Sequence, residues 1–174
     1  MSAPTLTPTL TTDRLTLRGH RPDDLDALTA MWADPAVYGM IGGKPRPREE
    51  VWIRLLRSVG QWSIFGYGAW VVCDRETGEV LGDIGLLESR RAIVPELTVP
   101  EVGWTLSPAA HGKGYAGEAM RAVLGWAEAQ GISRTCCIID PGNAASIRLA
   151  EKLGYAAPVE GVYHDRVILV FHRG

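Results

Sequence analysis

Three closely spaced glycines mark the part of this chain that is best suited to bind a phosphate group. Gly112, Gly114 and Gly117 lie within SPAAHGKGYAGEA, which leads from a predicted strand into an amphipathic helix. Glycine leaves backbone N–H groups uncovered, and the N-terminus of a helix carries about half a positive charge. Backbone amides in that position bind phosphates. The segment therefore predicts a ligand that contains a pyrophosphate.

The same segment matches a dinucleotide-binding pattern. Residues 112–117 form G-x-G-x-x-G, and Asp140 stands where a dinucleotide fold places the acid that binds ribose. In that fold the first glycine follows the strand directly, whereas here Ser107 to His111 intervene and Pro108 interrupts the strand. Residues 141–174 are also too few for the further β-α units. An NAD-binding oxidoreductase is therefore the less favoured interpretation, and a P-loop is excluded because the sequence contains no G-K-[ST].

A second motif narrows the ligand. The glycine segment also matches [Q/R]-x-x-G-x-[G/A] at Gly114 and Ala116, with His111 in place of the usual Gln or Arg, and residues 143–155 follow as NAASIRLAEKLGY. By these two motifs in this order the chain resembles the GNAT superfamily of acyl-CoA-dependent N-acetyltransferases. It is most similar to the branch that contains the ribosomal-protein alanine acetyltransferases.

The resemblance implies where acetyl-CoA binds. The coenzyme pyrophosphate would lie on the loop amides. The pantetheine arm would enter between residues 104–106 and residues 135–139, where two strands splay apart. It would pair with exposed strand backbone there, as an added strand does. Asn143 matches a residue that contacts this arm, and helix capping is compatible with that contact. The residues expected to bind the coenzyme are Trp104, Thr105, Leu106, His111, Gly112, Lys113, Gly114, Tyr115, Ala116, Gly117, Asn143 and Ser146.

The resemblance also implies candidates for proton transfer. Glu101 matches the acid that opens E-[IV]-G-[YW] and is the candidate catalytic base; the alternative is a solvent-facing carboxylate at the start of a strand. Ser146 matches a serine that serves as a proton donor near the thiol, or it bonds to backbone in the first helical turn. Tyr155 is the other candidate catalytic donor, or a packing aromatic residue. Glu88 and Glu96 are secondary candidates for the base.

The amine acceptor is not identified by the sequence. The irregular segment 34–48, with Tyr38, Met40 and Lys44, corresponds to the place where relatives have acceptor-binding elements. Three tryptophans are expected to fill the core rather than line a pocket: Trp32, Trp52 and Trp62.

Hydrophobic patterning places these residues in one mixed domain. Strands are expected near residues 15–18, 67–73, 80–86, 101–106, 135–139, 159 and 162–171, and helices near 22–34, 49–61, 115–130 and 143–153. The strands around residues 74–78 predict an antiparallel hairpin, and the helix between residues 106 and 135 predicts a parallel pair. This pattern predicts an α/β (α+β) fold with a mixed central sheet of about six to seven strands, mostly antiparallel with one parallel pair, flanked by about four helices. The resemblance implies that this is the GNAT fold and that the parallel pair is splayed.

Composition limits the remaining possibilities. The 174 residues suffice for one core, with residues 1–12 as a flexible lead-in and residues 13–174 as a single domain. The net charge of −2, without a basic run, argues against nucleic acid. Adjacent Cys136 and Cys137, with one more cysteine, suit packing rather than disulfides or a metal. The sequence shows neither a signal peptide nor an apolar run of the ~18 residues that cross a membrane, so we expect a cytoplasmic protein.

The sequence as a whole predicts an N-acetyltransferase that uses acetyl-CoA as co-substrate and needs no metal. The acceptor is a primary amine, either a protein N-terminus or a small-molecule amine, which attacks the thioester directly in a ternary complex. The alternative is a non-catalytic acyl-CoA-binding or sensing module of the same fold. The exposed terminal strands leave a homodimer open.

Overall fold

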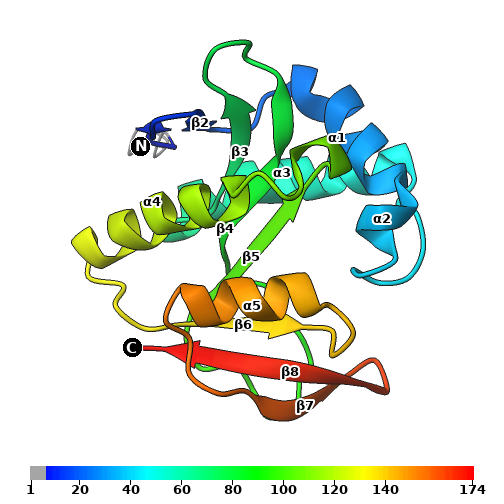
Figure 1. Cartoon of the computed structure of the whole chain (residues 1–174), viewed down its shortest axis with the longest axis vertical. Helices are drawn as coiled ribbons and strands as arrows, with labels where there is room; N and C mark the ends of the chain where they lie inside the picture. The colour runs from blue at the N-terminus through cyan, green and yellow to red at the C-terminus, as the bar shows by residue number, and fades with distance from the viewer. Residues whose placement is uncertain (1–6) are drawn as a thin grey trace.

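A single sheet of eight strands forms the centre of the molecule, in the order β1-β2-β3-β4-β5-β6-β8-β7 (Figure 1). The computed structural model describes residues 7–174. The strands are β1 (Leu10–Thr11), β2 (Leu15–Arg18), β3 (Ala69–Asp74), β4 (Val80–Leu87), β5 (Glu101–Leu106), β6 (Thr135–Ile139), β7 (Val159–Tyr163) and β8 (Arg166–Arg173).

The pairing of the strands confirms the predicted mixed sheet. Every neighbouring pair is antiparallel except β5 and β6, which are parallel. The number of strands is eight rather than the predicted six to seven, because Leu10 and Thr11 pair with Leu17 and Thr16 inside the stretch expected as a lead-in. A strand of two residues is too short to show the alternation on which the prediction relied. Residues 1–6 of that lead-in lie outside the described residues.

Five α-helices accompany the sheet, one more than the predicted four. The additional helix is the single turn α2, where the side chain of Asp34 accepts a hydrogen bond from the Ala36 amide at 2.8 Å. One turn is too short to show a helical period, so this stretch was expected to be irregular. The helices are α1 (Leu25–Ala33), α2 (Pro35–Tyr38), α3 (Arg48–Phe65), α4 (Tyr115–Ala129) and α5 (Ala144–Lys152), with short 3₁₀ turns η1 (Pro22–Asp24) and η2 (Pro108–Ala110).

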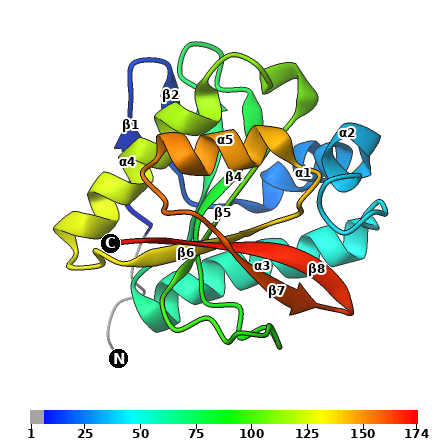
Figure 2. The same ribbon diagram turned by 60° about the horizontal axis from the view of Figure 1, so that its bottom comes forward.

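Two hydrophobic clusters hold these helices in place. In the larger cluster, α4 packs Met120, Val123 and Leu124 with residues of the sheet. The smaller cluster joins α1, α2 and α3 through Leu28, Met31, Trp32, Val37, Val51 and Leu55. Helices α3 and α4 lie on opposite faces of the sheet (Figures 1 and 2). The centre of the sheet is therefore covered on both sides, and an opening for a ligand has to come from the strands themselves.

The parallel pair supplies that opening. β5 and β6 share a single register pair, Glu101 with Cys136, next to the hydrogen bond from the Cys136 amide to the Pro100 carbonyl at 3.0 Å. β4 continues along the other edge of β5 as far as Leu106. The edge of β5 that faces β6 thus leaves the ladder after Glu101, which confirms the predicted splay.

Candidate active site

A cavity of about 740 Å³ lies where β5 and β6 diverge. Its walls come from β4, β5 and β6, from α3, from the first turn of α5, from the segment between α2 and α3, from the loop after β4 and from the β7–β8 hairpin. A volume of that order accommodates a small-molecule ligand. The β5 and β6 residues in its wall are Glu101, Val102, Gly103, Trp104, Thr105, Cys137, Ile138 and Ile139.

The glycine loop follows β5, whose residue Thr105 lines this cavity. Gly112 and Gly114 have φ values of 72° and 78°, a left-handed conformation that side chains disfavour. Gly114 is the N-cap of α4, so the amides of the following residues are the unpaired donors at a helix N-terminus. A Cβ atom added at Gly112 would meet nothing within 4 Å, which leaves its backbone open to a ligand.

Two side chains brace this loop. A ring nitrogen of His111, Nε2, lies 2.8 Å from the Leu106 carbonyl oxygen and ties the loop back to β5. Arg14 donates to the Lys113 carbonyl at 2.9 Å, pairs with Glu118 at 2.6 Å and lies 4.5 Å from the centre of the Tyr115 ring. Arg14 carries no sequence signal for this role, because it is about a hundred residues away from the loop that it supports.

Ser146 and Trp104 meet across the cavity. The indole Nε1 of Trp104 donates to Ser146 Oγ at 3.1 Å, and the Ser146 amide donates to Asn143 Oδ1 at 3.1 Å. Asn143 is therefore the N-cap of α5, as expected. Because the Ser146 oxygen already accepts a hydrogen bond, its own O–H is free to donate, which suits a proton donor.

Glu101 is buried in the wall of the cavity with only 4% of its surface exposed. Its carboxylate accepts a hydrogen bond from Ser89 Oγ at 2.8 Å and lies 3.4 Å from a guanidinium nitrogen of Arg91. The alternative of a solvent-facing carboxylate is wrong for this residue. Neither Ser89 nor Arg91 stands in a motif, so the sequence did not point to these two partners.

The other candidate residues lie outside this cavity. Tyr155 is 5% exposed within the larger hydrophobic cluster, and its hydroxyl lies 2.7 Å from Thr135 Oγ1. Burial raises the pKa of Tyr155 above its ordinary value, which suits a packing residue. Glu88 accepts a hydrogen bond from the Tyr67 hydroxyl at 2.9 Å, and both Glu88 and Glu96 border a neighbouring depression instead.

Comparison with known proteins identifies the fold and the family. The family described as acetyltransferase (GNAT) domain matches residues 14–156. The chain belongs to the GNAT acetyltransferase family. It is 36% identical over 151 residues to the uncharacterized protein YkkB of Bacillus subtilis, covering 83% of each chain. It is 28% identical over 159 residues to the uncharacterized N-acetyltransferase p20 of Bacillus licheniformis, covering 90% of this chain and 86% of p20.

Solved GNAT structures agree with this assignment. An acetyltransferase from Agrobacterium tumefaciens superposes with a TM-score of 0.83 at 32% identity, over 96% of this chain and 94% of that one. A ribosomal-protein-S5-alanine acetyltransferase from Vibrio fischeri shares the fold with a TM-score of 0.72 at 18% identity, over 95% and 96% of the two chains. The GNAT family is the predicted one, and the chain is an N-acetyltransferase. The dinucleotide interpretation of the glycine segment is therefore wrong.

The residues present fit acetyl-CoA, the co-substrate that is typical of this fold. A phosphinothricin acetyltransferase from Sinorhizobium meliloti, solved in complex with acetyl-CoA, shares the fold with a TM-score of 0.71 at 24% identity, over 91% and 87% of the two chains. In the present protein the open backbone at Gly112 and the free edge of β5 match a pyrophosphate and an extended arm. Within residues 7–174 no cluster of potential metal ligands is found, and no helix in that range has the length and apolar character to cross a membrane.

Proposed function

We propose that this GNAT enzyme transfers the acetyl group of acetyl-CoA to a primary amine by direct attack in a ternary complex. The observation that carries the proposal is one cavity whose wall holds both a buried carboxylate, Glu101, and a hydroxyl free to donate, Ser146. These are the two groups that a proton-coupled acyl transfer needs.

The atoms of the reaction assign a task to each group. The amine nitrogen forms a bond to the thioester carbonyl carbon, and the carbon–sulfur bond breaks. The nitrogen loses one proton, which Glu101 accepts directly or through a water, and the departing sulfur gains one, which Ser146 donates. A thiol has a pKa near 8.5, so the leaving group needs little help from an acid.

The pKa of the acceptor sets how much help the base must give. A lysine amine has a pKa of about 10.4, which is about 3.4 units above pH 7, so removing its proton at pH 7 costs about 4.6 kcal/mol. An α-amine with a pKa of about 8 costs only about 1.4 kcal/mol. A single carboxylate such as Glu101 is adequate for an α-amine.

The proposal is tested by following thiol release from acetyl-CoA with a panel of primary amines, including peptides with free N-termini. We expect turnover with at least one amine, an acetylated product by mass spectrometry, and a raised melting temperature with acetyl-CoA but not with NAD. Binding of acetyl-CoA without turnover of any amine would instead support an acyl-CoA-sensing module.

A further inference from the structure

The lining of the cavity as a whole is rich in positive charge. Its cationic lining residues are Lys44, Arg46, Arg54, Arg57, Arg91 and Arg166, and its acidic ones are Asp83, Glu101 and Asp140. The lining therefore has a formal excess of three positive charges, whereas the whole chain has a net charge of −2. Such an excess in a concave site concentrates anions.

Two of these arginines have no partner within the part of the chain that the structure describes. Arg46 pairs with Glu50, Arg91 with Glu101 and Arg166 with Asp140. The guanidinium groups of α3, from Arg54 and Arg57, make neither an ion pair nor a hydrogen bond with residues 7–174. Their charges remain available to a ligand.

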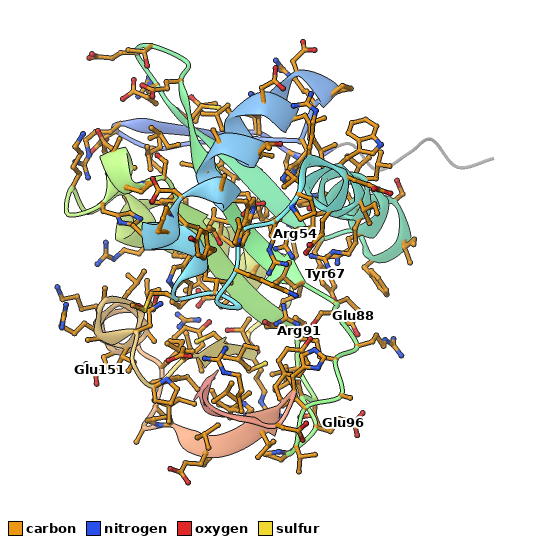
Figure 3. All side chains as sticks on the ribbon, turned by 90° about the vertical axis from the view of Figure 1, so that its right-hand side faces the viewer. Arg54, Tyr67, Glu88, Arg91, Glu96 and Glu151 are labelled. Atoms are coloured by element: carbon orange, nitrogen blue, oxygen red, sulfur yellow. The ribbon has the colours of Figure 1, made fainter. Side chains whose placement is uncertain are left out.

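Arg54 is the more deeply placed of the two. Its Nε atom is buried without a hydrogen-bond partner, and its Cζ atom lies 4.6 Å from the centre of the Trp32 ring. Burial lowers the pKa of Arg54 to about 10, so the group still carries its charge at pH 7. A charge taken out of water without a partner is costly to the fold. Figure 3 shows Arg54 coming from α3 and Arg91 from the loop after β4, and both residues line the cavity.

The arginines that line the cavity lie away from the loop that is expected to bind the coenzyme phosphates. Arg91 contacts Glu101, the first residue of β5, whereas the glycine loop follows Leu106 at the other end of that strand. Five residue steps along a strand span about 17 Å. No residue of the segment 107–117 lines the cavity, so the arginines that line it lie apart from the glycine loop.

We propose that the acceptor is a small-molecule amine that also carries a carboxylate or phosphoryl group, which Arg54 and Arg57 bind. This inference rests on the proposed acetyl transfer. Guanidinium groups bind both kinds of anion through charge-assisted hydrogen bonds, and they repel a polyamine. The cavity of about 740 Å³ has room for the thioester end of the coenzyme together with a small acceptor.

Matched pairs of acceptors test the proposal. Each amino acid is compared with its own carboxamide, and each aminoalkylphosphonate with the amino alcohol of the same length, by measuring kcat/KM from thiol release. We expect the anionic member of at least one pair to be preferred by at least about tenfold, which corresponds to about 1.4 kcal/mol. Equal rates for the members of every pair would overturn the inference but leave acetyl transfer intact.

Variants then locate the anion. R54Q and R57Q are each expected to raise the KM of the anionic acceptor about tenfold and to change the KM of acetyl-CoA and of neutral amines by a much smaller factor. R48Q is the matched control, because Arg48 lies on the same helix but is exposed and pairs with Asp26 outside the cavity. Arg54→Lys keeps the charge and serves if R54Q unfolds. Equal effects of R48Q and R57Q would contradict the assignment.

A binding measurement covers the case in which no amine is turned over. With coenzyme A saturating the glycine loop, calorimetry measures binding of inorganic phosphate to the wild type and the three glutamine variants. Weaker binding in R54Q and R57Q but not in R48Q supports the anion site even if the proposed reaction fails. Identical binding in all four proteins overturns it.

Discussion

Replacing Glu101 by glutamine is the sharpest test of the proposed catalytic base. General base catalysis contributes roughly 10²- to 10⁴-fold, so we expect kcat/KM with an α-amine at pH 7 to fall by that factor. Glutamine has nearly the same shape, and its carbonyl oxygen can still accept the hydrogen bond from Ser89. The loss is therefore expected in the chemical step rather than in the fold.

The structural cost of this substitution is small enough to be separated from catalysis. Arg91 loses a partner at 3.4 Å, and the side chains of Arg91 and Glu101 are 23% and 5% exposed, so the pair is largely enclosed. We expect a stability loss of roughly 1 to 3 kcal/mol, below the usual cost of breaking a buried pair because the two groups are farther apart than a hydrogen bond. Thermal unfolding of Glu101→Gln beside the wild type measures this cost directly.

The pH profile distinguishes a lost base from a damaged site. An α-amine with a pKa of about 8 is mostly protonated at pH 7 and mostly neutral above about pH 9. The ratio of wild-type to Glu101→Gln kcat/KM should therefore shrink as the pH rises from about 6.5 to about 9.5. Thiol release measured across this range provides the assay.

Ser89→Ala is the control for this prediction, because it removes the hydrogen bond to Glu101 but keeps the carboxylate. We expect it to lower kcat/KM by about tenfold, because a hydrogen bond to a charged carboxylate is worth roughly 1.5 kcal/mol or somewhat more. A Glu101→Gln deficit that does not change with pH, or that Ser89→Ala reproduces, would refute the reasoning.

Three further predictions concern the proton donor, the N-terminal ion pair and the thiols. Ser146→Ala is expected to lower kcat by no more than about tenfold, because a thiol with a pKa near 8.5 leaves readily. Steady-state kinetics measures this effect, and a thousandfold loss of kcat would contradict the prediction. Asp24→Asn is expected to cost about 3 kcal/mol of unfolding free energy at pH 7, because it breaks a buried pair with Arg18 at 2.7 Å. Burial alone would raise the pKa of Asp24, but hydrogen bonds from Arg18 and a backbone amide outweigh it and lower that pKa. The difference from wild type in urea titrations should therefore begin to shrink near about pH 4, where the unfolded carboxyl takes up its proton, and vanish only below the lowered pKa of the folded carboxyl. Burial raises the pKa of Cys136 to about 12 and covers all three cysteines, so a thiol reagent at pH 8 should label none in the folded protein and three after unfolding.

The burial of Glu101 shows where prediction from the sequence stops. A glutamate at the start of a strand is usually exposed, and the motif alone left that alternative open. In the structure Ser89 and Arg91, from the loop before β5, enclose the carboxylate. That enclosure depends on how the loop after β4 folds back, which no local pattern encodes.

Tyr155 is a second residue whose surroundings could not be predicted from the sequence. Its place after the α5 motif made it a candidate donor, yet its hydroxyl contacts Thr135 and its ring lies in the hydrophobic core. The surroundings of Tyr155 are decided by how the segment after α5 packs against β6. The spacing of residues along the chain does not contain that information.

The sequence by itself determined the glycine loop, the capped helix α5, the antiparallel hairpin and the parallel pair, because each depends on residues close together in the chain. Gly112 and Gly114 are needed for positive φ angles, and Asn143 caps the helix that it begins. Tertiary structure alone brought α3 to the cavity between β5 and β6 and placed Arg54 and Arg57 in the same lining as the buried Glu101. These residues come from segments more than forty positions apart, and only the packing of distant helices and strands against each other decides which of their side chains meet.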